Sequence, residues 1–381
     1  MTTKTKKKRI LLTPKKSKSA KKNKPVVKKL VIKKPVAKVI KKVAVKKIVP
    51  KKLLLKKLVK IIKKPSKILK KQIEVIEKPV ELPQTPAPYE QKHESVLLKE
   101  VLEHLDLPKK KIIVDATLGL GGHSLAILEN LPGNGRLIAF EADSCHLQLA
   151  QKRLKTFQDQ VTLLHANFVQ LEEHLKQLKI KQIDGILFDL GLASPHVDDA
   201  QRGFSFMKDG PLDMRFDSTQ KKTAAEIVNT VSEKELIRIF QEYGEETRAR
   251  KIALEIVKTR KSKPYKTTIQ LSKMIEKLVP REGHIHPATR VFQALRIAVN
   301  SELDVLQEAL TQAVTLLKPD GRIAVISYHS LEDRIVKIFF KAHAAAGTLQ
   351  IITKKPLVPL DEEVRRNPRS RSAKLRVAQK L

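Results

Sequence analysis

Glycines and polar side chains are concentrated in one short segment, Asp115-Ala-Thr-Leu-Gly-Leu-Gly-Gly-His-Ser124. The segment follows an apolar run, 112–114, of the kind found in buried strands, and it precedes a helical pattern of apolar residues. Glycines at 119, 121 and 122 allow the backbone to approach a ligand closely and to adopt positive φ angles. A strand, a glycine turn and a helix in this order are typical of the ligand-binding loop of a Rossmann-like sheet.

The element that follows places a carboxylate beside this loop. A second strand is expected over 136–140, and it ends at Glu141, twenty residues after Gly121. A carboxylate at that position can accept hydrogen bonds from two ribose hydroxyls. Further strands of the same kind are expected over 161–164, 183–188 and 322–327, and the first two are followed by Phe168 and Asp189. We therefore predict an open α/β sheet whose ligand crevice lies at the carboxyl ends of its strands, with Phe168 placed to flank an adenine.

Two cofactor classes suit such a crevice. A dinucleotide enzyme would carry a third glycine where this sequence has Ser124. Asp115 stands four positions before the first glycine, where a methyltransferase loop holds the amino-acid end of S-adenosylmethionine. The sequence favours S-adenosylmethionine over a dinucleotide, and a Rossmann-like scaffold without a cofactor is a further alternative.

Composition divides the chain of 381 residues, whose formal net charge is +37. Residues 1–80 hold 31 of the 77 basic residues and only 2 of the 40 acidic ones, with no aromatic residue and no glycine. Such a Lys-rich segment repels itself and buries little, so we expect a disordered tail with nonspecific affinity for RNA. Within it, 51–64 forms a basic amphipathic pattern, so contact with a membrane surface is an alternative. Three prolines mark 81–90 as a linker.

The sequence contains one cysteine, Cys145, so an intrachain disulfide is excluded and a cytoplasmic location is expected. No apolar run reaches the length of about 18 residues that a transmembrane helix needs. Cys145 follows the second expected strand, where we expect it to pack in a helix interface rather than to act as a nucleophile.

The segment from Asp189 to Arg215, DLGLASPHVDDAQRGFSFMKDGPLDMR, closely resembles the ribosomal RNA small subunit methyltransferase H family, the bacterial 16S ribosomal RNA cytosine-N4 methyltransferases. The resemblance covers the chain from about Tyr89 to its last residue, and residues 1–80 have no counterpart in it. Four further blocks resemble the same family: HESVLL (93–98), HPATRVFQALR (286–296), SYHSLEDRIVK (327–337) and NPRSRSAKLR (367–376).

The resemblance implies a class I S-adenosylmethionine-dependent methyltransferase core interrupted by a helical domain. On it we place the core at 91–209 and 301–381 and the helical insertion at 210–300, where the sequence shows helical rather than strand-like patterns. The implied cofactor contacts are Gly121, Gly122, His123, Glu141, Phe168, Asp189 and His196. Glu141 replaces the more usual Asp and keeps a carboxylate. His196 replaces the usual Gln, and its reach differs from that of an amide.

Cytosine N4 is a poor nucleophile because its lone pair is delocalised into the ring. Acceptors for the N4 hydrogens favour transfer, and the candidate catalytic residues are Asp189, Ser194 and Pro195, with the intervening loop carbonyls. Whether Asp189 contacts the cofactor, the amine or both stays open. No metal is expected, because no ligand set accompanies His123. Candidate RNA-backbone contacts, each equally suited to an internal ion pair, are Arg202, Arg215, Arg290, Arg296, Arg334, Arg369 and Arg371.

The predicted activity is therefore methylation of cytidine N4 in 16S ribosomal RNA, with the small ribosomal subunit as partner. The same chemistry on DNA and a noncatalytic RNA-binding or ribosome-assembly protein on the same fold are the two alternatives. Nothing in the sequence sets the oligomeric state.

Overall fold

The computed structural model of the chain describes residues 94–281, 283 and 285–381. The expected tail (1–80), its amphipathic stretch (51–64) and the linker (81–90) lie outside the described residues. No helix in the described part of the chain combines the length and the apolarity needed to cross a membrane.

Within the described residues, seven strands form one sheet in the order β3-β2-β1-β4-β5-β7-β6. β1 to β5 run parallel, whereas β7 is antiparallel to both β5 and β6. The strands are β1 (Ile112–Asp115), β2 (Arg136–Glu141), β3 (Val161–His165), β4 (Ile183–Asp189), β5 (Leu317–Ser327), β6 (Leu349–Ile351) and β7 (Lys374–Lys380). The five strands expected from the sequence are confirmed, and β5 begins five residues earlier than expected.

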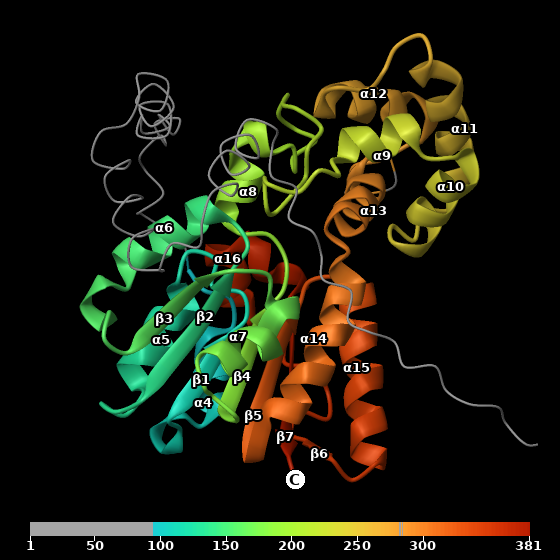
Figure 1. The fold of residues 1–381 in the computed structure, drawn as a ribbon. Helices are drawn as coiled ribbons and strands as arrows, with labels where there is room; N and C mark the ends of the chain where they lie inside the picture. Colours follow the sequence, from blue (N-terminus) through green and yellow to red (C-terminus); the bar gives the residue numbers. More distant parts are fainter. Residues whose placement is uncertain (1–93, 282, 284) are drawn as a thin grey trace, which may run out of the picture. The chain divides into compact units, whose positions relative to one another are not determined.

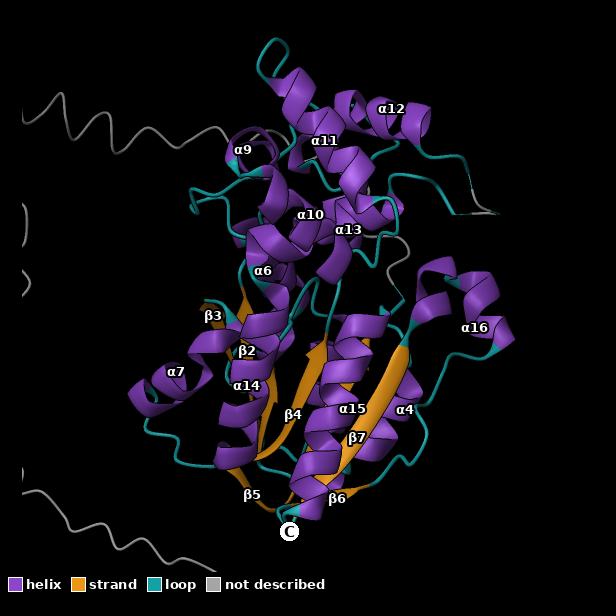
Figure 2. Cartoon of the chain, turned by 90° about the vertical axis from the view of Figure 1, so that its right-hand side faces the viewer, coloured by secondary structure: helices purple, strands orange, loops and turns teal. Residues whose placement is uncertain are grey.

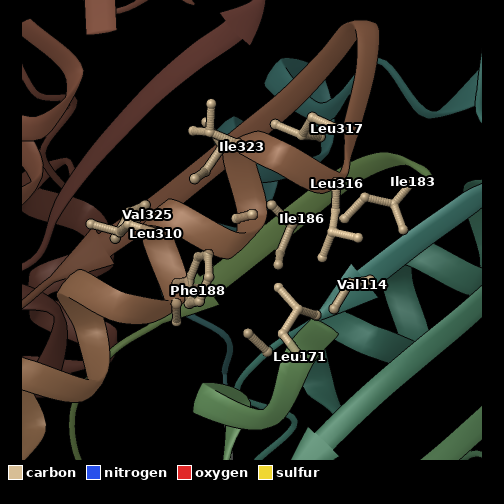
Figure 3. Close-up of a cluster of buried hydrophobic side chains, with 14 of the residues drawn as sticks. Val114, Leu171, Ile183, Ile186, Phe188, Leu310, Leu316, Leu317, Ile323 and Val325 are labelled. Atoms are coloured by element: carbon tan, nitrogen blue, oxygen red, sulfur yellow. The ribbon is translucent and has the colours of Figure 1, made fainter. Parts of the chain in front are cut away.

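Helices cover both faces of the sheet because the strand residues are apolar on both sides. Val114 packs into a cluster with α7, α14 and α15, whereas its neighbour Ile113 packs on the opposite face with α4, α5 and α6. Figure 3 shows the first cluster, and Figure 2 shows α14 and α15 lying over β4 and β5. The helices are α4 (Leu98–Leu105), α5 (Gly122–Asn130), α6 (Ser144–Arg153), α7 (Leu171–Gln177), α14 (Glu302–Leu316) and α15 (Ser330–Ala345).

A separate group of helices is inserted between β4 and β5 (Figure 1). These helices have their own apolar core. The group contains α9 (Ala224–Thr230), α10 (Glu233–Glu242), α11 (Ala249–Arg260), α12 (Thr268–Leu278) and α13 (Thr289–Asn300). Ser232 caps α10, because its side chain accepts a hydrogen bond from the Glu235 amide. The short α8 (Ser194–Asp198) precedes the group, and α16 (Asp361–Arg366) lies before β7.

One expected helix is two helices. The apolar pattern over 289–317 predicts a continuous helix, but α13 ends and α14 begins at Ser301, whose φ of +52° is left-handed. The amide of Ser301 bonds to the carbonyl of Ile297, which closes α13, and the chain then turns into the layer that covers the sheet. The break makes α13 part of the inserted core and α14 part of the sheet core.

Candidate active site

A pocket of about 580 Å³ opens at the carboxyl ends of the parallel strands. Its walls come from the segments that follow β1, β2, β3 and β4, together with residues of α13, α14 and the segment after β5. β1 and β4 are neighbours in the sheet although β2 and β3 come between them in the chain, so the strand order reverses here. Open α/β sheets bind ligands at such a reversal, and the volume is within the roughly 300–1,000 Å³ of small-molecule sites.

The glycine loop forms one wall of the pocket. Gly119 and Gly121 have φ angles of +52° and +77°, which residues with a side chain rarely adopt. A Cβ on Gly122 would collide with the Ser95 hydroxyl. Ser124, which stands where a dinucleotide-binding loop has its third glycine, donates a 2.6 Å hydrogen bond to the buried carboxylate of Asp115. The serine therefore fixes the aspartate inside the loop.

Glu141 ends β2 with both carboxylate oxygens engaged. Oε2 accepts a 2.8 Å hydrogen bond from the Gly119 amide, and Oε1 accepts one of 2.8 Å from the Asp143 amide. Burial raises the pKa of Glu141 to about 8, because desolvation outweighs these two hydrogen bonds. The glycine loop and the carboxylate thus hold each other in position at the wall of the pocket.

Asp143, two residues after Glu141, contacts the side chains of His196 and Arg202. It caps α6 through the Cys145 amide, lies 3.1 Å from His196 Nε2 and accepts a hydrogen bond from Arg202 Nη1. Burial alone would raise the pKa of Asp143, but His196, His146 and Arg202 hold it far below its usual range. Burial lowers the pKa of His196, so the imidazole is neutral and donates through Nε2 to Asp143.

Asp189 ends β4 and faces the pocket with both oxygens contacted. Tyr328, which follows β5, donates a 2.8 Å hydrogen bond to Oδ1, and His123 Nδ1 lies 3.3 Å from Oδ2. The other ring nitrogen of His123 is 3.0 Å from the carbonyl of Val96, which can only accept. Burial would lower the pKa of His123, but Asp189 and Asp115 raise it. The imidazolium form satisfies both neighbours at once, so the site contains a His123–Asp189 ion pair.

Two groups of side chains have metal-ligand composition. They are Asp143 with His146 and His196, and Glu302 with His329 and Glu332. In each group an arginine pairs with a carboxylate, Arg202 with Asp143 and Arg296 with Glu302. A fixed positive charge on the carboxylate opposes a cation there, so we assign no metal to either group.

The structure brings most of the residues predicted from the sequence to one pocket. The pocket is lined by Gly122, His123, Glu141, Phe168, Asp189, Ser194 and His196. Gly121 shapes the loop behind the wall, and Pro195 lies in the first turn of α8; neither residue lines the pocket. The expectation for Cys145 was wrong, because its side chain is exposed on α6 rather than packed in a helix interface.

Several of the arginines named as candidate RNA-backbone contacts form ion pairs within the chain. The pairs are Arg202–Asp143, Arg215–Asp213, Arg296–Glu302, Arg334–Glu245 and Arg369–Asp198. Three residues of the site, Tyr328, Asp143 and Thr117, were not predicted from the sequence. The hydroxyl of Thr117 accepts a 2.6 Å hydrogen bond from the Asp189 amide. Tyr328 directly follows β5, and Thr117 lies two residues after the end of β1. Their positions after strand ends are the sequence signal by which both could have been predicted.

The chain is similar to proteins of a known family. The profile of the MraW methylase family matches residues 90–381. Ribosomal RNA small subunit methyltransferase H from Caldicellulosiruptor saccharolyticus is 49% identical over 306 residues, covering 76% of this chain and 99% of that protein. The protein of the same name from Sulfurihydrogenibium is 49% identical over 294 residues, with the same coverage of both chains. Among solved structures, an rRNA methylase from Streptococcus thermophilus aligns with 13% identity and a TM-score of 0.36, covering 76% of this chain and 99% of that chain.

Proposed function

Since the chain belongs to the MraW methylase family, we propose that it transfers a methyl group from S-adenosylmethionine to the exocyclic N4 of a cytidine in small-subunit (16S) ribosomal RNA. The observation that carries the proposal is the continuity of one pocket from Glu141, through the glycine loop, to Asp189. A nucleoside-binding carboxylate and an acceptor for an amine are thereby placed in one cavity.

The residues present fit the proposed cofactor. Glu141 offers carboxylate oxygens to ribose hydroxyls, and the left-handed glycines keep the loop free of side chains. Phe168 lines the pocket after β3, where it can pack against an adenine. His196 Nδ1 is a buried acceptor without a partner among the described residues, so a donor from the ligand would satisfy it.

The bound cofactor supplies a methyl group that its sulfonium charge makes electrophilic. Asp189 is assigned to the acceptor amine: one carboxylate oxygen accepts a hydrogen bond from N4–H, which draws the nitrogen lone pair out of conjugation with the ring. The cofactor would supply the methyl group to N4 and would be left as a neutral thioether, and the proton that N4 loses would pass to Asp189 or to water. Tyr328 and His123 keep the carboxylate in place during this transfer.

The loop from Asp189 to Pro195 positions the acceptor. Gly191 has a φ of +119° and packs against the ring of Tyr328, so the loop turns tightly over the catalytic carboxylate. Ser194 begins α8 and lines the pocket, and Pro195 stabilises the first turn of that helix. We assign Ser194 to contact with the nucleotide and Pro195 to shaping of the loop.

The partner is the small ribosomal subunit or its RNA, and the substrate implies a cytoplasmic location. We propose that residues 1–80 add RNA affinity through their lysines, because their attraction to phosphates needs no fixed structure. We further propose domain boundaries near residues 210 and 300, because the residues between them supply most of the separate apolar core.

Nucleoside mass spectrometry of small-subunit RNA tests the function. Cells without the gene should lack an N4-methylated cytidine, and the native gene should restore it where an Asp189→Ala copy does not. Restoration by the Asp189→Ala copy would remove Asp189 from catalysis. Methylation of duplex DNA in place of small-subunit particles would favour the DNA alternative, and failure of the purified protein to bind S-adenosylhomocysteine would favour the noncatalytic one.

A further inference from the structure

The pocket extends beyond the residues assigned to the cofactor. Glu141 and Phe168 belong to the β2 and β3 side of the crevice, whereas Tyr328 follows β5 on the other side of β4. The wall also includes Arg296 of α13 and Glu302 of α14, on either side of the break between the two helices. Asp189 lies between the two sides, since β4 separates β1 from β5 in the sheet.

Arg296 is a buried cation with hydrogen-bonding capacity left over. Its side chain is 13% exposed, and its Nε and Nη2 donate to the two carboxylate oxygens of Glu302 at 2.9 and 2.8 Å. This pair uses one edge of the planar guanidinium. No acceptor among the described residues binds Nη1, so the end-on edge formed by Nη1 and Nη2 stays available to a ligand.

Glu302 fixes the direction of that edge. The carboxylate is 11% exposed, so the bidentate pair with Arg296 is shielded from solvent and holds the guanidinium plane in one orientation. Nearby, Asn300 donates hydrogen bonds to the carbonyls of Met214 and Arg296 and accepts one from the Phe216 amide, so it has no free group for a ligand of this kind. Arg296 therefore lines the pocket with donors that can read an acceptor edge.

We propose that Arg296 recognises the N3 and O2 acceptors of the target cytosine while Asp189 accepts from its N4 amine. This inference rests on the proposed function and assigns base selection within the same pocket. Cytosine presents an amine donor beside two acceptors, which matches a carboxylate beside a guanidinium edge. Adenine also has an exocyclic amine, but it offers N1 followed by a C–H group, and uracil has no amine. The pair of side chains thus selects cytosine by hydrogen bonding.

Arg296→Met and Arg296→Lys test the assignment in the full-length protein. Both should lower kcat/KM for methylation of small-subunit particles, the methionine variant by about 100-fold, while the affinity for S-adenosylhomocysteine stays within about threefold. The matched control is Arg238→Met, which removes an arginine from surface pairs with Glu235 and Glu242. A methionine variant that folds and retains wild-type kcat/KM would overturn the assignment.

A second measurement does not depend on how the variants fold. Particles are reconstituted with 3-deazacytidine, which lacks the N3 acceptor, at the methylated position and offered to the wild-type protein. Replacing cytidine by 3-deazacytidine should lower the kcat/KM of the wild-type protein at least tenfold. The same replacement should lower the kcat/KM of the Arg296→Lys variant by a smaller factor. Equal rates on cytidine and 3-deazacytidine would overturn the inference. If the wild-type protein methylates no unmodified particle, the proposed function fails and takes the inference with it.

Discussion

The phenol of Tyr328 donates a 2.8 Å hydrogen bond to the carboxylate of Asp189 and so joins the ends of β5 and β4 at the floor of the pocket. Burial and the charge of Asp189 raise the pKa of Tyr328 well above its ordinary value, so the phenol stays protonated and remains a donor. The neighbouring strands that build the sheet also hold the carboxylate that we propose for catalysis.

Substitutions at this pair should differ in severity. Asp189→Asn removes the charged acceptor and should lower kcat by about 100-fold or more. Tyr328→Phe removes one donor while His123 still contacts the other oxygen, so we expect a loss of only about threefold to tenfold. Single-turnover methylation of small-subunit particles measures both. Equal losses in the two variants would show that Asp189 does not act on the amine.

Glu141 should make cofactor binding depend on pH. Its pKa of about 8 in the folded protein means that it is mostly protonated at pH 7, whereas ribose hydroxyls that donate to it favour the charged form. Binding of S-adenosylhomocysteine at pH 7 should therefore release close to one proton, measured by calorimetry in buffers of different ionisation enthalpy. Glu141→Gln should release none, and an unchanged proton release in this variant would assign it to another group.

The same group predicts a pH dependence of stability. Because the folded pKa of Glu141 lies above the unfolded value of 4.5, folding favours the protonated carboxyl. The free energy of unfolding contributed by this group therefore falls as the pH rises from 4.5 to about 8 and changes little above that. Urea unfolding should show Glu141→Gln gaining stability relative to the wild type across this interval. A difference that stays constant with pH would contradict the raised pKa.

Gly191 should tolerate no side chain. Its φ of +119° is unfavourable for other residues, and a Cβ would lie 2.9 Å from Cδ2 of the Tyr328 ring. Gly191→Ala should therefore destabilise the protein by about 1–3 kcal/mol and lower turnover by displacing Tyr328. Gly133→Ala is the matched control, because a Cβ there meets nothing within 4 Å. Thermal unfolding and turnover of the two variants should separate them, and equal behaviour would contradict the close packing.

His196 should be replaceable by glutamine. The imidazole donates to Asp143 through Nε2 and leaves Nδ1 as an acceptor, and an amide also provides one donor and one acceptor group. His196→Gln should keep the affinity for S-adenosylhomocysteine within about threefold, whereas His196→Leu should weaken it by about tenfold or more. Calorimetric titration distinguishes these outcomes, and tight binding by His196→Leu would remove this residue from the site.

Removal of residues 1–80 should change RNA binding more than catalysis. The segment carries 31 basic and 2 acidic residues, so its contribution to affinity should fall steeply as salt is added. The shortened protein should bind small-subunit RNA more weakly at low salt and with a smaller dependence on salt concentration, while kcat is unchanged. Filter binding over a salt series tests this, and identical salt dependence would show that the tail does not contact RNA.

The parallel strands could be predicted because each is a short apolar run that ends in polar or small residues. Glu141 and Asp189 could be placed at one sheet edge for the same reason, since carboxyl ends of parallel strands meet there. β7 could not be predicted in this way, because Arg376 interrupts its apolar residues and its partner β5 is distant in the chain. Pattern alone does not state which strands pair.

The contacts within the site could not be predicted from the sequence for a related reason. His123, Asp189 and Tyr328 come from three segments that meet only when the sheet has formed, so neither the ion pair nor the phenol hydrogen bond has a local signature. The break at Ser301 was missed because apolar spacing continues across it, while a single left-handed residue redirects the helix. The spacing of apolar residues indicates which face of a helix is buried. It does not indicate the direction that the next helix takes after a turn.

The position of β7 has a consequence for how the protein is made. This strand lies between β5 and β6, so one edge of β5 acquires its neighbour only after translation has continued through the codons of Lys374–Lys380. Until then the backbone groups along that edge have no strand to pair with. A nascent chain stopped before β7 would thus carry the residues proposed for catalysis on an unfinished scaffold.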